Sequence, residues 1–208
     1  MPGVFLFFFK NVENVQEDSL KEGNVRNLKS IVLQPRFLQA ITAAAFAYAV
    51  MSFLMTATPL SMHVMENMSL KETGLVLQFH VVAMFLPSLI TGNLIKKYGH
   101  SAIIYGGVLF FFITVLLSLF EQTYLNYMLS LIFLGLGWNF LFISGTSLVV
   151  LTYNKEEKFK VQGINDLIVF STMALASLSA GILLNSIGWK MMNICLLYTS
   201  PSPRDGSI

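Results

Sequence analysis

The residues of this chain that are able to do chemistry stand inside or beside long apolar stretches. Gln78 and His80 lie near the start of one stretch, and Trp138 and Asn139 lie at the middle of another. A histidine changes charge near neutral pH, which suits proton coupling or the binding of a polar solute. An indole offers a flat apolar wall, and an amide in such surroundings needs polar partners. We therefore predict that these four residues line a pathway for a substrate or a proton.

Some of these residues also have a purely structural interpretation. His80 would then be a neutral imidazole whose hydrogen bond is made with an adjacent helix. Asn139 would hydrogen-bond a neighbouring helix and stabilise the association of the two helices by roughly 1 kcal/mol. Asp166 follows Asn165 at the start of a further apolar stretch, where a helix N-terminus favours a carboxylate. It is either a cap in the first helical turn or a contact that closes a cytoplasmic gate. The residue types leave these alternatives open.

The spacing of residues does not indicate an enzyme or a metal centre. His63 stands at the end of the first apolar stretch, and His80 lies about two helical turns, ~10 Å, further from the same end of the helices. His100 stands at the other end of the helices, so these three histidines do not converge on one ion. No Ser-His-Asp arrangement and no glycine-rich phosphate loop is recognisable. The single cysteine excludes a disulfide framework and a thiolate metal cluster. We expect no enzymatic activity, no metal and no cofactor.

The composition favours a lipid environment. Hydrophobic residues make up 55% of the 208 residues and charged residues only 12%, with a mean hydropathy of +0.67. Soluble domains carry about 25% charged residues, and a soluble chain of this size would not hide so much apolar surface. The net charge of +2 is not gathered in a basic patch, so a nucleic-acid partner is not expected.

Five apolar stretches are each long enough to cross a bilayer, which takes about 20 helical residues. Because backbone groups in lipid must bond within their own segment, the spans are helices. We expect an all-α, polytopic transmembrane helix bundle, closely packed at small residues such as Gly135, Gly137 and Gly145. The predicted spans are residues 37–64, 73–95, 101–120, 125–153 and 164–187, with the start of a sixth at residue 189.

Basic residues gather on one side of this topology. They occur in residues 1–36, in the turn at residues 96–100 and in the loop at residues 154–163. Five crossings place these three segments on the same side of the membrane. Because cytoplasmic loops carry an excess of Lys and Arg, we expect that side to be the cytoplasm.

The two ends of the chain differ from its middle. Residues 195–208 resemble the translation of a sequencing adapter, and a natural Ser/Pro-rich tail is the alternative. Residues 4–9 fit the last turns of a preceding helix better than a short membrane anchor. Residues 1–36 are therefore expected to hold that helix end and a connector, with a short amphipathic helix near residues 28–33. Residues 37–194 form the bundle.

The turn between the second and third predicted spans carries a family resemblance. Its sequence, GNLIKKYGH, resembles the signature turn of the major facilitator superfamily (MFS), Gly-x-x-x-Asp-Arg-x-Gly-Arg, with Lys96 in place of the acidic residue. Gly92 is expected to let a neighbouring helix approach closely, and Gly99 to supply the tight turn. Lys96 and Lys97 hold the turn in the cytoplasm.

A wider resemblance covers about residues 33–194. Four segments look like helices seven, eight, ten and eleven of bacterial members: LMTATPLSMHV, LQFHVVAMFLPSLITGNLIKKYG, LGLGWNFLFISGTSLV and VQGINDLIVFSTMALASLSAG. The resemblance implies the second six-helix half of a transporter, with residues 1–36 as the central cytoplasmic connector. The N-terminal half is then missing from this chain, which is a fragment.

The function implied by the resemblance is secondary transport of a small organic solute by alternating access, with the solute held between the two halves. We expect proton coupling, a location in the bacterial inner membrane, and the lipid bilayer and the missing half as partners. The aromatic, weakly polar residues favour efflux over nutrient uptake. The alternative is a channel or a structural membrane subunit, although the sequence shows no ring of charges or selectivity loop.

Overall fold

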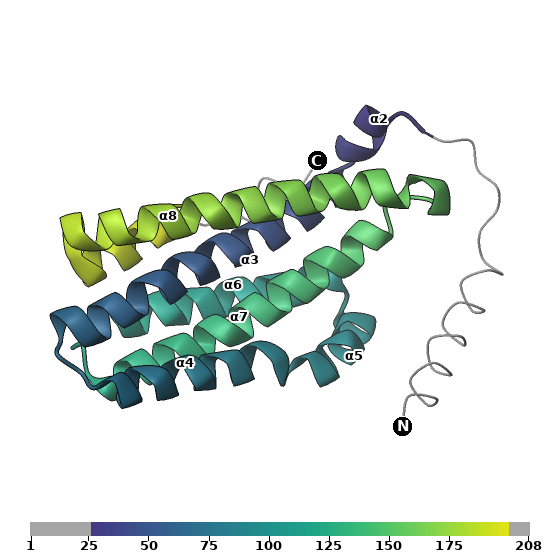
Figure 1. Cartoon of the computed structure of the whole chain (residues 1–208). Coiled ribbons are helices and arrows are strands. Elements are labelled where there is room, and N and C mark those ends of the chain that lie inside the picture. The colour runs from purple at the N-terminus through teal and green to yellow at the C-terminus, as the bar shows by residue number, and fades with distance from the viewer. Residues whose placement is uncertain (1–25, 200–208) are drawn as a thin grey trace, which may run out of the picture.

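The computed structural model describes residues 26–199 and the side chains of residues 26–194. Within this range the chain forms helices and contains no strand, and the long helices lie together as one bundle (Figure 1). The predicted all-α fold is confirmed. The expectations for residues 1–25 and 200–208 lie outside the described residues.

The elements follow one another through short connections. Their bounds are α2 Leu28–Val32, α3 Pro35–Pro59, the π-helical turn η1 Leu60–Met65, α4 Leu70–Phe85, α5 Ser88–Tyr98, α6 His100–Ser118, α7 Tyr124–Val150, the 3₁₀ turn η2 Lys155–Glu157 and α8 Lys158–Thr199. The short helix expected near residues 28–33 is confirmed as α2.

The described helices meet the requirements of a multi-pass membrane protein. Four are long and apolar enough to cross a bilayer: α3 together with η1, α6, α7 and α8. α4 and α5 qualify as a fifth span when taken together, although they are bent by 40°. The span predicted over residues 73–95 is thus divided into two helices at Leu86 and Pro87, because proline has no backbone N–H to continue the helical ladder.

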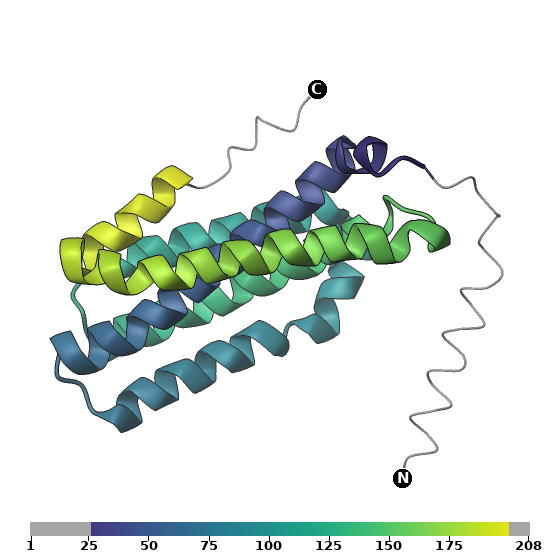
Figure 2. The ribbon, with the colours of Figure 1, turned by 45° about the horizontal axis from the view of Figure 1, so that its top comes forward.

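The last described helix, α8, contains a break at Gly188. This glycine has φ 73° and ψ 171°, which are not helical angles. The chain changes direction there, and the final helical segment runs back along the bundle (Figure 2). The break lies between the predicted fifth span and the predicted start of a sixth.

Close packing between helices is centred on α7. A Cβ on Gly135 would lie 2.8 Å from the carbonyl oxygen of His80 in α4, and one on Gly145 would lie 2.8 Å from the carbonyl oxygen of Ala40 in α3. A Cβ on Gly137 would lie 3.0 Å from the carbonyl oxygen of Gly107 in α6. The expected packing role of these three α7 glycines is confirmed.

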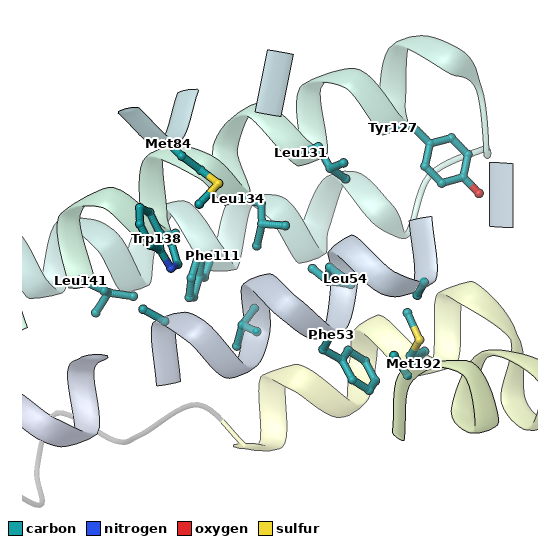
Figure 3. Close-up of a cluster of buried hydrophobic side chains, with 14 of the residues drawn as sticks. Phe53, Leu54, Met84, Phe111, Tyr127, Leu131, Leu134, Trp138, Leu141 and Met192 are labelled. Carbon is teal, nitrogen blue, oxygen red and sulfur yellow. The ribbon is translucent and has the colours of Figure 1, made fainter. Parts of the chain in front are cut away.

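The side chains between these helices form the main hydrophobic cluster. Leucines and Trp138 project from α7 toward residues of α3, α6 and α8 (Figure 3). Its members include Phe53, Leu54, Met84, Phe111, Tyr127, Leu131, Leu134, Trp138, Leu141 and Met192. α7 therefore lies at the centre of the described bundle.

α2 is fixed to one end of the bundle by a second hydrophobic cluster, which includes Ile31, and by an ion pair. The guanidinium of Arg26 donates from Nη2 to Oε2 of Glu157 at 2.7 Å and from Nε to Oε1 at 3.1 Å. The Glu157 side chain is 2% exposed and also accepts the backbone N–H groups of Arg26 and Asn154. These bonds, led by the Arg26 guanidinium, lower the pKa of Glu157 to about 2.

Glu157→Gln is expected to lower the melting temperature at pH 7, and the difference from the original chain is expected to shrink at pH 3. The folded-state pKa of about 2 lies below the ordinary value of 4.5. The stabilisation is therefore complete above about pH 4.5 and is lost as the pH falls toward about 2. Thermal unfolding in detergent micelles at the two pH values measures this effect.

Glu156→Gln is the matched control, because Glu156 is the exposed neighbouring carboxylate. Its melting temperature should stay close to that of the original chain at pH 7. An equal difference for Glu157→Gln at pH 7 and pH 3 would contradict the role given to the ion pair.

Candidate functional site

Trp138 lies at the centre of an aromatic cluster built from four helices. Its ring stacks on Phe142, one turn further along α7, with 4.8 Å between ring centroids. Tyr48 of α3 meets both rings edge-on and lies 5.4 Å from Trp138. Phe85 of α4 lies 6.1 Å from Trp138, and Phe170 of α8 lies 6.0 Å from Tyr48. We call these five side chains the aromatic cluster.

The aromatic cluster has a buried base and an exposed edge. Trp138 is 4% exposed, whereas Phe85 and Phe170 are 60% and 52% exposed. Among the described residues, the indole Nε1 of Trp138 has no hydrogen-bond partner. The cluster therefore combines flat apolar rings with an unpaired donor, the combination that suits an aromatic solute with polar edges.

Asn139 is fully buried and joins α7 to the break between α4 and α5. Its Nδ2 donates to the carbonyl oxygen of Met84 at 2.7 Å and to the hydroxyl of Ser88 at 2.8 Å. Its Oδ1 accepts a hydrogen bond from the Thr91 hydroxyl at 2.6 Å. Protein groups thus occupy the amide, which favours the structural interpretation, and the pathway role of Asn139 stays a prediction.

Gln78 and His80 face different sides of α4. Gln78 is exposed and His80 is fully buried against α7, because a step of two residues turns about 200° around a helix. His80 Nδ1 lies 2.7 Å from the carbonyl oxygen of Leu131. Within the described part of the chain its Nε2 has no partner. The structure therefore does not bring these two predicted pathway residues together.

The signature turn joins α5 to α6. Gly99 has φ 83° and ends α5, so the tight turn predicted at this glycine is confirmed. Lys96 and Lys97 are exposed in the last helical turn, where a helix C-terminus favours cations. A Cβ on Gly92 would have no described neighbour within 4 Å. α5 buries the adjacent Thr91, and the close approach expected at Gly92 stays a prediction.

Asp166 lies in the third turn of α8, because the helix begins at Lys158. The alternative of a first-turn cap is therefore wrong. A capping box formed by Asn154 and Glu157 sets the earlier start. Asp166 is exposed and accepts a hydrogen bond from Asn165 Nδ2 at 3.1 Å. Its role as a gate contact stays a prediction.

The structure adds residues that the sequence did not single out. Phe142 had a local signal, since it follows Trp138 by four residues and shares its side of the helix. Tyr48, Phe85 and Phe170 had none, because their contacts are made between helices distant in sequence. Among the described residues no three His, Cys, Asp or Glu side chains come together as a metal site.

Comparison with known proteins adds a family to this architecture. The sequence model of the Major Facilitator Superfamily matches residues 40–197. The chain belongs to this superfamily. It is 40% identical over 168 residues to the riboflavin transporter RfnT of Brucella anthropi, a match that covers 81% of this chain and 42% of that relative.

Two further MFS relatives come from Bacillus subtilis. The uncharacterized MFS-type transporter YdeG is 28% identical over 191 residues, with 91% of this chain and 44% of the relative covered. The uncharacterized MFS-type transporter YddS is 30% identical over 151 residues, with 71% of this chain and 34% of the relative covered. The chain thus spans less than half the length of the curated relatives it matches. All three are named as transporters and none as an enzyme.

His80 is expected to resist modification by diethyl pyrocarbonate in membranes, whereas His63 should react. His80 is enclosed between α4 and α7, and His63 is exposed beside the end of α3. Mass spectrometry of the two modified peptides measures both rates in one sample. Modification of His80 as fast as that of His63 would show a water-filled position and contradict the buried, structural interpretation.

Proposed function

We propose that this chain forms the second half of a secondary transporter in the bacterial inner membrane, and that the solute is riboflavin or a molecule with a similar flat ring system. The name of the Brucella anthropi relative supports the solute. The matched shares of 42% and 44% of two relatives support a half-transporter.

The observation that carries the solute class is the aromatic cluster. A flat solute ring would stack on the exposed rings of Phe85 and Phe170, which pack against Trp138 and Tyr48 respectively. Each aromatic pair contributes about 0.5–1.5 kcal/mol beyond the apolar area that it buries. The unpaired Nε1–H of Trp138 would donate to a polar atom at the edge of the solute ring, since a buried donor needs an acceptor.

Alternating access distinguishes this proposal from a channel or a structural subunit. A carrier exchanges a labelled solute molecule for an unlabelled one across the membrane, because it presents one binding site to each side in turn. Counterflow of labelled riboflavin in vesicles therefore separates the two classes. Placing the labelled riboflavin either inside or outside the same vesicles measures the direction of transport. Adding an uncoupler measures the proton coupling that the sequence predicts.

In the full-length transporter that contains this chain, Trp138→Ala is expected to weaken apparent riboflavin affinity by about 2- to 10-fold. This range corresponds to the loss of one aromatic pair. Trp138→Phe keeps a ring and should retain most of the affinity. Uptake of radiolabelled riboflavin by cells that lack their own uptake system measures the effect.

Phe112→Ala is the matched control, because Phe112 is a 47% exposed phenylalanine of α6 outside the aromatic cluster. Its apparent affinity should equal that of the original protein. No riboflavin uptake or counterflow by the original protein would overturn the proposed solute, and equal affinity in Trp138→Ala would remove the aromatic cluster from the binding site.

A further inference from the structure

The break between α4 and α5 is held by one side chain from another helix. Pro87 has no N–H to continue the helical ladder of backbone hydrogen bonds. Asn139 donates to the Met84 carbonyl and to the Ser88 hydroxyl. The Thr91 hydroxyl lies 2.6 Å from Asn139 Oδ1 and 2.8 Å from the Pro87 carbonyl oxygen. One amide thus contacts the last turn of α4 and the first turn of α5.

α5 is otherwise loosely attached. Among its described residues only Thr91 is buried, whereas α4 buries five residues. Leu89 and Ile90 are 79% and 57% exposed. The helix begins after Pro87 and ends at Gly99, whose φ of 83° is not helical. A short helix between two breaks, with one buried side chain, has the low local stability expected of a moving segment.

α4 and α7, in contrast, are packed backbone to backbone. Gly135 lies one turn before Asn139, and a Cβ there would lie 2.8 Å from the His80 carbonyl oxygen. His80 Nδ1 also lies 2.7 Å from the Leu131 carbonyl oxygen. Leu131, Gly135 and Asn139 therefore form one strip of α7 that fixes α4 and leaves α5 as the part able to turn.

We propose that Asn139 is a positioning residue that holds the bend between α4 and α5, and that α5 turns about Pro87 when its hydrogen bonds open. The movement carries the turn at Lys96 and Lys97 with it. In a transporter this would set the rate of the conformational step rather than the affinity for the solute. That consequence rests on the proposed function, whereas the bend itself does not.

Spin labels at Lys71→Cys in α4 and Asn93→Cys in α5 test the bend directly, in the chain with Cys195→Ser and in lipid nanodiscs. Double electron–electron resonance measures the distribution of distances between them. Asn139→Leu keeps the size of the side chain and removes its hydrogen bonds. It is expected to at least double the width of the distribution found with Asn139.

Thr91→Val removes one of the hydrogen bonds without changing the side-chain shape, and it should broaden the distribution as well. If Asn139→Leu does not fold, the Thr91→Val variant alone tests whether these hydrogen bonds hold the bend. Ser144→Ala changes another buried polar residue of α7 and should leave the width unchanged. Unchanged widths in the Thr91 and Asn139 variants, or equal broadening in the Ser144 variant, would overturn the proposal.

Transport provides the second readout. In the full-length protein, Asn139→Leu is expected to change the maximal rate at least about fivefold, the factor set by ~1 kcal/mol of lost hydrogen bonding, with KM nearly unchanged. Thr91→Ser retains the hydroxyl and should keep the original rate. A changed KM at an unchanged rate would overturn the positioning role. An original protein that does not transport riboflavin would overturn the proposed solute, while the distance measurement would still decide the bend.

Discussion

The close approach of the α7 backbone to its neighbours is the contact on which the rest of the bundle depends. Lipid chains are as apolar as leucine side chains, so burial gives helices in a membrane little reason to associate. Tight packing and hydrogen bonds between helices are the interactions that hold the helices together instead. Gly135, Gly137 and Gly145 bring α7 against α4, α6 and α3 at distances that leave no room for a side chain. Without these contacts, the polar bonds to α4 and the aromatic cluster would not form.

The spacing of residues along α7 explains how one helix serves several contacts. Leu131, Gly135 and Asn139 recur every four residues and meet α4. Trp138 and Phe142 have the same spacing and belong to the aromatic cluster. Since residues four apart share one side of a helix, the α4 contact and the candidate solute surface are neighbouring strips. A solute on the aromatic cluster would therefore lie next to the residue that holds the α4–α5 bend.

The sequence predicts this fold well where the signal is local. Apolarity predicts the helices, and Gly99 marks a turn, because each depends on residues close together in the chain. The sequence predicts one span over residues 73–95, whereas the structure divides it at Leu86 and Pro87. The ion pair of Arg26 and Glu157 joins residues 131 positions apart, and no local pattern indicates it. Most of the candidate site was missed for the same reason, because its rings come from four helices.

Melting temperatures of alanine variants in one detergent measure how far the close approach of the α7 backbone stabilises the bundle. Gly135→Ala, Gly137→Ala and Gly145→Ala each place a methyl group against a neighbouring backbone, an overpacking that costs about 1–3 kcal/mol. Gly74 of α4 has no described atom within 4 Å of a Cβ, and alanine is the better helix former. The three α7 variants are expected to melt several degrees below the original chain, and Gly74→Ala is not. Equal melting temperatures for all four variants would contradict the stabilising role of this close approach.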